Sequence, residues 1–560
     1  MAVVSSPRPL LRNPLLWVSS LYLAMGIPFN IIMGGTAARM YKSLGYSDGQ
    51  ITVALGSIGV AWSLKPLWAA FLDMYRTKKF FVLTTEVLIG GLLVAVAMSL
   101  PVPGFFQVST ALFWVMAFAS STQDICADGI YLTALDKPTQ ARLAGVQSTF
   151  WVLGKVLATG AVIAVFDRVR QDRGWSDERM WQAVLLVCAG SMGLLAMLHA
   201  FRLPVGSVSG RPENIRQVGR DFIGTAVSFF QKRNFWGMIA FVFLYRLGEG
   251  LILLEGQLFL QSPVDQGGLG LTAGQVSNID ALWGTGFSIA GGLLGGVFVS
   301  RYGLARSLGF LGLCLNVPHF TYVYLSQAAA AGHGVDYTTI VAMVSIEKFG
   351  YGFGFVGNMI YMMQQLAPGR STMTHYAFAT ALMNLMLVPT NMVSGPLAEM
   401  LGFSTFFIVV MFASVPSAWA AFKAPFPHRG EEPAGEAGAA ILDDPGRQTP
   451  AGRAAQSLAG RASLQAMLVL LTILLFDVGV LGTLQGRSPG EGRLQFWLLV
   501  GSLGLKLFLA RRVFRLAEEA AVAGGGETIY LGNARGARIA TGIGLFVSAL
   551  MLGFAAWRTF

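Results

Sequence analysis

Long apolar runs recur along the chain and are separated by short polar segments. A helix needs about 20 apolar residues to cross roughly 30 Å of hydrocarbon, and the runs of this length form two sets of six with a polar linker between them. The pattern predicts an all-α polytopic membrane protein with two six-helix halves, residues 1–201 and 235–424. The expected spans lie at about 15–36, 51–72, 81–100, 107–132, 143–166, 182–201, 235–260, 276–299, 307–326, 338–366, 374–394 and 402–422.

The segments outside these halves have a different composition. In the linker 202–234, apolar side chains between 214 and 231 recur at helical spacing, which predicts an amphipathic helix on the cytoplasmic membrane surface. Residues 425–463 are rich in Pro, Gly and Ala and predict a flexible linker. Further spans are expected within 464–560, at about 464–484, 494–510 and 538–557. The middle run is short and contains Lys506, so fourteen spans in all remain an alternative to the expected fifteen.

Lys and Arg are unevenly distributed between alternate loops. If the N-terminus is cytoplasmic, the cytoplasmic segments hold most of these residues, which is the positive-inside bias of bacterial membrane proteins. The sequence therefore predicts a cytoplasmic N-terminus. The cytoplasmic set is Arg8, Arg12, Arg76, Lys78, Lys79, Lys137, Arg142, Arg202, Arg211, Arg216, Arg220, Lys232, Arg233, Arg301, Arg306 and Arg370, and the outside set is Arg39, Lys42, Arg168, Arg170, Arg173 and Arg179.

The two halves share a short basic turn. The second span ends at Asp73 followed by MYRTKKF, and the eighth ends at Ser300 followed by RYGLARS. A basic turn at the same place in both halves predicts a duplicated transporter built from parallel repeats. The residues expected to form these gating turns are Asp73, Arg76, Lys78, Lys79, Arg301 and Arg306.

Composition supports a membrane protein and excludes most soluble classes. Only 12% of the 560 residues are charged, whereas soluble domains carry about 25%. The net charge of +11 comes from loop residues and indicates topology instead of nucleic-acid binding. The three cysteines, Cys126, Cys188 and Cys314, lie in apolar runs without metal-ligand spacing, so packing roles are expected. No phosphate loop, zinc-protease or nucleophile-elbow motif is present, and no enzyme activity, metal or cofactor is predicted.

Charged residues inside apolar runs are functional candidates, because burying a charge in hydrocarbon costs at least a few kcal/mol. Asp124 and Asp128 lie four residues apart in the fourth span and share one helix face. Two close carboxylates resist joint ionisation, so one could hold a proton, and Asp124 is the stronger candidate proton carrier. The alternative is that both only brace the cytoplasmic end of the helix.

The fifth span carries a polar stripe of Gln147, Ser148, Trp151 and Lys155 at helical spacing. Lys155 lies about 20 Å along its helix, at about 1.5 Å per residue, at nearly the depth of Asp124. The sequence predicts that these two residues form an internal ion pair. The pair could open when solute or proton arrives, or it could be a permanent structural bridge.

The C-terminal half has two further charged groups. In the seventh span Arg246 and Glu249 are three residues apart, so Arg246 could pair with Glu249 or bind a carboxylate or phosphate of the solute. In the tenth span Glu347 and Lys348 precede FGYGFGFVG, whose glycines and rings indicate a bendable helix with ring faces for a sugar, or packing alone. Glu249 and Glu347 are second-tier proton-coupling candidates. The substrate-binding candidates are Gln123, Gln147, Trp151, Lys155, Arg246, Lys348 and Tyr351.

Other buried polar residues have weaker roles in the sequence. Lys65-Pro66 predicts a kink with a buried charge in the second span. Glu86 and Asp280 are expected to be unpaired acids, His375 is expected at the membrane interface, and Asp477 has no predicted role.

Four segments carry a resemblance to a known family: SLKPLWAAFLD (63–73), STQDICADGIYLTALD (121–136), YRLGEG (245–250) and EKFGYGFGF (347–355). The chain resembles the major facilitator superfamily, and within it the family that unites AmpG-type muropeptide permeases with acetyl-CoA transporters. The resemblance covers about residues 15–422. It implies proton-driven import of anhydro-muropeptides across the bacterial inner membrane. After Asp128 the sequence reads GIYLT, where AmpG-type permeases tend to have an aromatic residue and an Arg, and this stretch is closer to the acetyl-CoA branch.

The function predicted from the sequence is proton-coupled secondary transport by alternating access, with a small polar solute and protons as partners. The protein is expected to be a monomer in the bilayer. Transport of another polar anion, such as a CoA thioester or a siderophore, is an alternative. A membrane signalling or scaffold protein without transport is an alternative of another class, although such a protein has little need for the buried charges.

Overall fold

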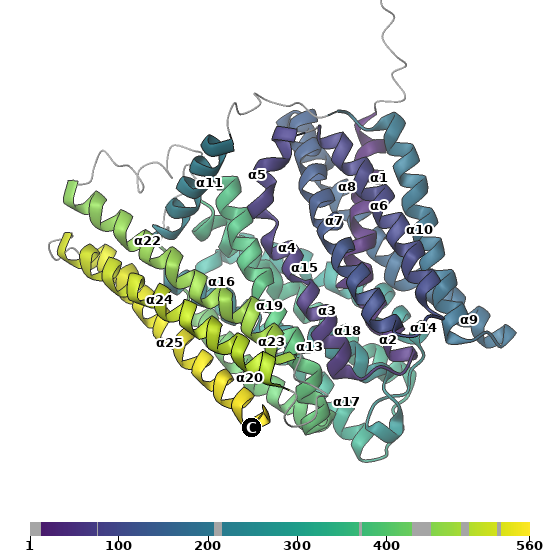
Figure 1. Cartoon of the computed structure of the whole chain (residues 1–560). Coiled ribbons are helices and arrows are strands. Elements are labelled where there is room, and N and C mark those ends of the chain that lie inside the picture. The colour runs from purple at the N-terminus through teal and green to yellow at the C-terminus, as the bar shows by residue number, and fades with distance from the viewer. Residues whose placement is uncertain are drawn as a thin grey trace, which may run out of the picture.

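The computed structural model describes residues 13–75, 77–205, 215–368, 372–427, 450–482, 492–523 and 528–559. Within these residues all regular structure is helical, and 15 helices are long and apolar enough to cross a membrane. The described residues therefore hold the fifteen candidate spans that the sequence predicts. Figure 1 shows the helices as one obliquely packed bundle, with the C-terminus at one end.

The N-terminal half contains six spans, several of them made of consecutive shorter helices. Its elements are α1 (Pro14–Ile32), α2 (Thr36–Ser43), α3 (Asp48–Ile58), α4 (Val60–Leu64), α5 (Pro66–Tyr75), α6 (Lys78–Ser99), α7 (Phe105–Ala134), α8 (Lys137–Val156), the π-helix η2 (Leu157–Ala161), α9 (Val162–Arg173) and α10 (Asp177–Arg202). The second span breaks at Lys65, directly before Pro66, as the sequence predicts.

A linker helix, α11 (Ile215–Phe230), follows where the apolar spacing predicts an amphipathic helix. The C-terminal half then repeats the six-span plan. Its elements are α12 (Phe235–Tyr245), α13 (Leu247–Gln261), η3 (Val264–Gln266), α14 (Ala273–Ser277), the π-helix η4 (Asn278–Gly284), α15 (Thr285–Tyr302), α16 (Leu304–Asn316), η5 (Val317–His319), α17 (Phe320–Ala330), α18 (Tyr337–Tyr361), the π-helix η6 (Met362–Leu366), α19 (Thr372–Leu401) and α20 (Phe403–Lys423).

The start of the second span in each half has the same local design. Ser47 and Gln50 form a capping box at the start of α3, and Thr272 and Gln275 form one at the start of α14. In each box the hydroxyl accepts a backbone N–H of the first turn, and the Gln side chain accepts the N–H of the capping residue. The repeat predicted from the basic turns is thus also present in the caps.

Three long helices follow the second half: α22 (Pro450–Thr472) with η8 (Ile473–Asp477) and α23 (Val478–Gly482), then α24 (Arg493–Ala523) and α25 (Thr528–Thr559). The predicted flexible linker 425–463 is wrong for residues 450–463, which are helical. Ala is the strongest helix former, and Ala455, Ala459 and Ala462 of this segment are buried. Residues 428–449 of that linker lie outside the described part.

The two halves contact each other near the end of the bundle opposite α11, which we call the far end; the end with α11 is the linker end (Figure 1). At the far end α2 packs against α13, α9 against α14, and η2 against η4. On another side α3 lies along α19, and α4 and α5 continue this contact toward the linker end.

Small residues set the spacing of α3 and α19. A Cβ atom at Gly395 would lie 2.3 Å from the carbonyl oxygen of Asp48, and one at Gly56 would lie 2.9 Å from the backbone nitrogen of Met392. The backbone N–H of Gly395 also donates to Thr52 Oγ1 at 3.1 Å. The two halves therefore approach backbone to backbone, as small residues allow in membrane helices.

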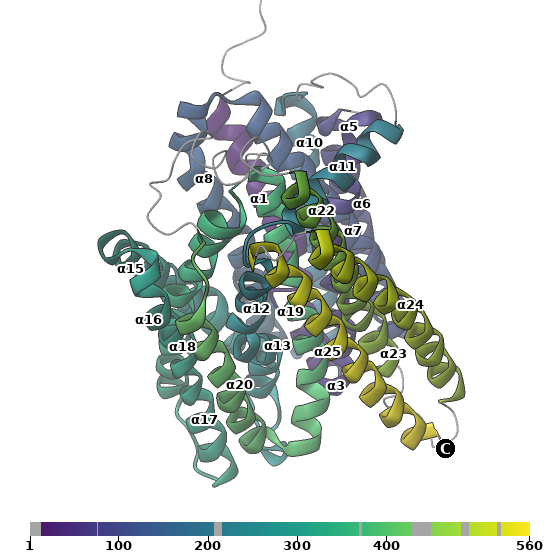
Figure 2. The same ribbon diagram turned by 90° about the vertical axis from the view of Figure 1, so that its left-hand side faces the viewer.

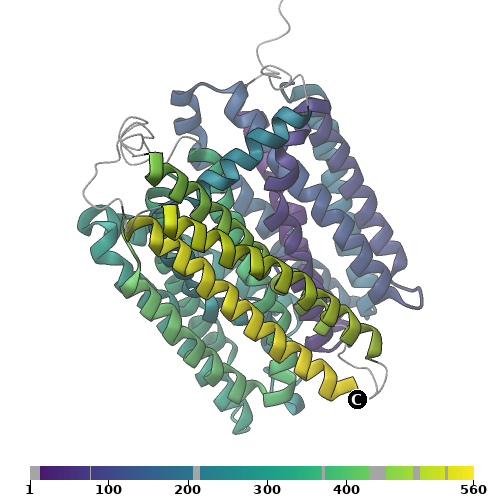
Figure 3. The ribbon, with the colours of Figure 1, turned by 60° about the vertical axis from the view of Figure 1, so that its left-hand side comes forward.

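The extra helices form one layer against the side where the halves meet (Figures 2 and 3). α23 contacts both α3 and α19, and α22 contacts α11. Val60 of the first half, Val388 and Met392 of the second, and Val478 of the layer share one apolar cluster. The layer is thus packed onto both halves at once.

Candidate functional site

The N-terminal half brings two acidic residues of α7 together with a lysine of the second span. Lys65 Nζ lies 2.6 Å from Asp124 Oδ2, and about a quarter of each side chain is exposed. One turn further along α7, Asp128 Oδ1 accepts a hydrogen bond from the hydroxyl of Tyr22 at 2.7 Å. The break at Pro66 leaves Lys65 at the junction of α4 and α5, where its side chain reaches α7. The pair is therefore partly exposed within the helix bundle.

The predicted ion pair between Lys155 and Asp124 is wrong. Lys155 Nζ lies 3.6 Å from Asp280 Oδ2 on η4, while Asp124 pairs with Lys65. Similar depth along two helices does not fix which way each side chain points, because that depends on the rotation of each helix. The expectation that Asp280 is unpaired is wrong for the same reason.

Arg39 joins the two halves at the far end. Its side chain is fully buried, and its guanidinium donates to Thr159 O at 2.7 Å, Gln257 Oε1 at 2.7 Å, Asp280 Oδ2 at 3.1 Å and Ser277 Oγ at 3.2 Å. Assigning Arg39 to an outside loop is therefore wrong. We call Arg39, Lys155, Gln257, Ser277 and Asp280 the Arg39 cluster.

Two π-helices build the surroundings of this cluster, η2 in the fifth span and η4 in the eighth. They pack against each other, and a Cβ atom at Gly160 would lie 2.4 Å from that of Ala281. A π-turn widens the helix and disturbs the regular hydrogen bonding, which leaves the carbonyl of Thr159 to accept from Arg39. Both halves thus supply irregular backbone at the place where they meet.

In the C-terminal half Arg246 is paired on its own span. Its guanidinium donates to both carboxylate oxygens of Glu249, with Nε to Oε2 at 2.7 Å and a second bond from Nη2 to Oε1. The seventh span is interrupted at Arg246, between α12 and α13. The guanidinium carbon also lies 4.8 Å from the ring centroid of Phe355. Of the two sequence alternatives, pairing with Glu249 is the one present in this structure.

The glycines of α18 pack against neighbouring helices, and its aromatic residues include site candidates. A Cβ at Gly352 would lie 2.0 Å from Ser288 O, and one at Gly354 would lie 2.5 Å from Leu311 O, so the glycines allow close contact with α15 and α16. The helix is continuous through them. Tyr351 and Phe355 stack at 5.5 Å, half-buried.

Glu347 and Lys348 of α18 form an ion pair of their own. Lys348 Nζ lies 3.0 Å from Glu347 Oε2, and 17% of the Lys348 side chain is exposed. The lysine also lies 6.0 Å from the ring of Tyr351 and interacts electrostatically with Asp280. Lys348 therefore approaches the Arg39 cluster from the second half.

The structure separates Gln123 from the other candidates. Gln123 is fully buried and its amide donates to Glu86 at 3.2 Å. Glu86 also pairs with His199 Nδ1 at 2.8 Å, and His199 Nε2 lies 2.9 Å from Ser20 Oγ. Glu86 is thus not an unpaired acid, and Gln123 belongs to this internal polar group.

Gln147 and Trp151 are half-buried on α8, and Trp151 packs near Phe29 with ring centroids 5.6 Å apart. His375 is buried and its Nε2 lies 2.9 Å from Ser228 Oγ of α11, so it packs against the linker helix, and its interfacial depth stays a prediction.

The basic turns lie at the linker end. Lys79 Nζ donates to Ala200 O at 2.8 Å, and the Lys78 side chain lies over Gly129. Arg301 and Arg306 are exposed. Arg76 and the side chain of Asp73 lie outside the described residues, so the gating role of these turns stays a prediction.

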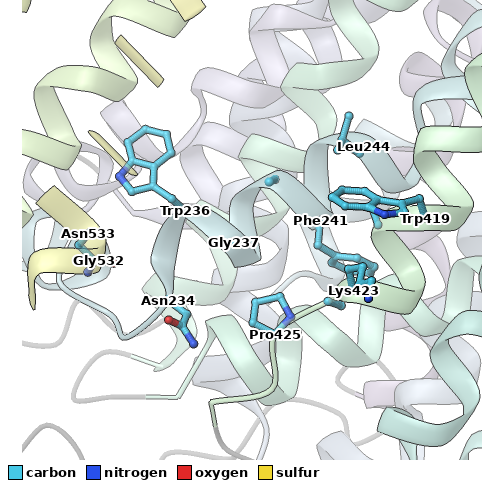
Figure 4. Close-up of a pocket in the computed structure, with 13 residues that line it drawn as sticks. Asn234, Trp236, Gly237, Phe241, Leu244, Trp419, Lys423, Pro425, Gly532 and Asn533 are labelled. Carbon is cyan, nitrogen blue, oxygen red and sulfur yellow. The ribbon is translucent and has the colours of Figure 1, made fainter. Parts of the chain in front are cut away.

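A pocket of about 400 Å³ lies away from these charged groups (Figure 4). Figure 4 shows Trp236, Phe241 and Trp419 around it, with Lys423 and Asn533 at its edge. It lies between α12, α20 and α25, and none of its lining residues is a substrate-binding candidate.

Sequence reasoning missed Arg39 and Gln257 as site residues. Arg39 follows an apolar run closely enough to suggest a loop position, and its burial depends on contact with the second half. One sequence signal does indicate a helical position for Arg39. No Gly or Pro follows Gly35 before Ser43, so a helix can continue through this segment.

Solved structures of transporters share this fold. The D-xylose–proton symporter matches with a TM-score of 0.56 at 12% identity, covering 74% of this chain and 98% of that chain. The nucleoside transporter NupG matches with a TM-score of 0.55 at 17% identity, covering 73% and 98%. The chain has the major facilitator fold.

Curated relatives are bacterial permeases and transporters. The anhydromuropeptide permease of Escherichia coli strain K12 is 26% identical over 411 residues, which is 70% of this chain and 76% of that protein. The putative transporter AmpG 4 of Rickettsia conorii is 23% identical over 413 residues, covering 70% of this chain and 92% of that protein. No protein-family model matches the chain. The predicted resemblance to AmpG-type proteins is confirmed, and the chain is a multi-pass membrane protein with the major facilitator fold.

Proposed function

We propose that the protein is a proton-coupled secondary transporter that imports an anionic glycopeptide of the anhydro-muropeptide class by alternating access. In this proposal it lies in the bacterial inner membrane with a cytoplasmic N-terminus, so the far end faces the periplasm. The observation that carries the proposal is the set of partly exposed charged side chains from both halves, Lys65, Asp124, Lys155 and Lys348, below a far end closed by Arg39.

Proton coupling is assigned to Asp124, with Asp128 as its modulator. Asp124 forms an ion pair with Lys65, and Asp128 is four residues away on the same helix face. If Asp124 takes up a proton, the pair loses its Coulomb attraction and Lys65 is released. Because charged groups in low dielectric interact strongly, this single proton removes a strong attraction between α7 and the second span.

Solute binding is assigned to cations from opposite halves. Lys155 lies on α8 and Lys348 on α18, and both interact with Asp280. A solute carboxylate between them would replace Asp280 as the partner of these ammonium groups. The stacked rings of Tyr351 and Phe355 and the half-buried Trp151 offer apolar faces for a sugar ring.

Alternating access follows from the position of the Arg39 cluster. Its groups belong to α2 and α8 of one half and to α13, α14 and η4 of the other. Separating the halves at the far end breaks all of its bonds between halves and admits solute from the periplasm. Rocking of two parallel repeats about a central site is the motion that this duplicated architecture allows.

The test is uptake into proteoliposomes that hold the purified full-length protein. Labelled anhydro-muropeptide is offered with an imposed inward proton gradient, and acetyl-CoA is offered to parallel vesicles. We expect muropeptide accumulation that an uncoupler abolishes. Accumulation of acetyl-CoA instead would reject the solute class and keep the transport mechanism, and accumulation that ignores the uncoupler would reject proton coupling.

A further inference from the structure

Glu255 on α13 is a buried acid to which the proposed mechanism assigns no role. Its side chain is fully buried, and neither carboxylate oxygen has a hydrogen-bond partner among the described residues. An ionised carboxylate left in this state would cost several kcal/mol. A buried unpartnered carboxyl therefore needs a ligand, and the surrounding groups decide which ligand fits.

Three charged residues surround Glu255 from the elements packed against α13: Lys42 of α2, Asp48 of α3 and Glu399 of α19. Lys42 is already paired with Asp48, because its Nζ lies 2.6 Å from Asp48 Oδ1. Glu399 Oε1 accepts the backbone N–H of Gly49 at 2.7 Å, in the first turn of α3, where helix termini favour an anion. The nearby Arg39 is held by the Arg39 cluster.

The charges in this group do not balance. One lysine faces three carboxyl groups, and Glu255 interacts electrostatically with Asp48. Two facing carboxylates have no hydrogen to share until one of them binds a proton, and they then form a strong hydrogen bond. No group of His, Cys, Asp and Glu among the described residues has the geometry of a metal site. A proton is therefore the ligand that fits.

The group exists only when the halves are joined. Lys42 and Asp48 belong to the N-terminal half, while Glu255 and Glu399 belong to the C-terminal half. The contact of α3 with α19 and of α2 with α13 brings these residues together at the far end. Separating the far ends would expose Glu255 to water, where it can ionise.

We propose that Glu255 is a proton-binding site of the far end, occupied when the two halves close there and vacated when they separate. The proton comes from the water on the far side and binds a Glu255 oxygen, and the resulting O–H donates to the Asp48 carboxylate. This site is distinct from Asp124 and Asp128, and it rests on the proposed alternating access but not on the identity of the solute.

The proposal fixes the sign of a pH effect. Because closure binds a proton, acidic conditions favour the closed far end and alkaline conditions favour the open one. For one proton, the closing equilibrium changes by at most about tenfold per pH unit over the range in which Glu255 is ionised in the open state.

The experiment measures the distance between the far ends of the two halves without any solute. Spin labels are placed at Asp172→Cys and Gln266→Cys, both exposed and on opposite halves, after Cys126, Cys188 and Cys314 are replaced by Ala. Double electron–electron resonance from pH 5 to pH 8 is expected to show the short-distance population falling as pH rises. In Glu255→Gln, which is neutral at every pH, the population should stay closed throughout.

Two matched variants keep the test decisive. Glu255→Asp retains a titratable carboxyl and should retain the pH dependence, and Glu178→Gln, an exposed acid of the same end, should behave as the unmodified protein. An unchanged pH profile in folded Glu255→Gln would overturn the proposal. A short-distance population that changes with Na⁺ concentration at constant pH would also overturn it, in favour of a cation site. A positive result stands even if muropeptide uptake fails, so the two proposals are separable.

Discussion

The ion pair between Lys65 and Asp124 combines two properties that rarely coexist inside a membrane. It is charged and at the middle of the bundle, yet about a quarter of each side chain is exposed. Exposure lets a proton reach Asp124. Because the surroundings have a low dielectric constant, binding that proton changes the interaction energy of the pair strongly. The pair of Asp477 and Lys506 is different, because both side chains are buried in the extra helices.

Replacing Asp124 by Asn should abolish proton-driven accumulation, because the amide cannot carry the proton, while exchange of internal for external solute continues. The measurement is uptake under a proton gradient beside counterflow without one, in the same vesicles. Glu178→Gln, which removes an exposed acid of the far end, is the control for nonspecific damage. Full accumulation in Asp124→Asn would remove Asp124 from the coupling mechanism.

Replacing Arg39 by Gln should favour an open far end. The variant loses the guanidinium bonds to Asp280 and Gln257 and leaves Lys155 and Lys348 as the cations that interact with Asp280. Breaking a buried charged network by removing one partner typically costs about 3–5 kcal/mol. The label pair at Asp172 and Gln266 would report this as a longer distance, and an unchanged distance would show that the Arg39 cluster does not hold the far end.

At this scale the sequence identifies which residues are charged and buried but not how they pair. The pair of Arg246 and Glu249 is predictable because three residues on one helix fix their separation. Lys155 with Asp280 and Lys65 with Asp124 join different helices, so they depend on rotations that spacing along one span does not contain. The partners of Arg39 lie mostly on the other half, so they depend on how the two halves pack, which the pattern along one span does not contain.

At the scale of elements, the approach of α3 to α19 is set by Gly56 and Gly395. Replacing Gly395 by Val should push the helices apart, because its Cβ would lie 2.3 Å from a backbone oxygen that cannot rotate away. The expected result is an open far end with reduced uptake. Gly91, whose Cβ would meet nothing within 4 Å, is the matched site for a Gly→Val control. A closed far end in Gly395→Val would show that the helices accommodate the side chain.

The extra helices are joined by one buried polar group. Asp477 accepts from Lys506 of α24, from Ser502 of α24 at 2.6 Å and from Ser548 of α25 at 3.3 Å. Asp477 had no predicted role from sequence because its partners lie on two other helices.

Asp477→Leu or Lys506→Leu alone should lower the thermal unfolding temperature, because each leaves an unpaired buried charge, at a cost of about 3–5 kcal/mol. The double variant Asp477→Leu with Lys506→Leu should recover most of that loss. Thermal unfolding in detergent measures all three proteins. Additive losses in the double variant would show that the two residues do not act as a pair.

For the whole molecule, periodicity and repeats predict the architecture well. Six spans, a linker helix, six spans and three more follow from run lengths, since crossing the bilayer imposes one length on every helix. The interruptions inside spans are harder to predict. Pro66 marks one break, whereas η2 and η4 contain no proline and arise where the halves pack against each other.

The layer of α22, α23, α24 and α25 has a consequence for the lipid around the protein. It covers the line where α3 meets α19, with Val478 seated between Val60 and Val388. Acyl chains therefore cannot enter between the halves from that side. Among the described residues, the opposite line, where the fifth span faces the eighth, has no such layer, so lipid can contact both halves there.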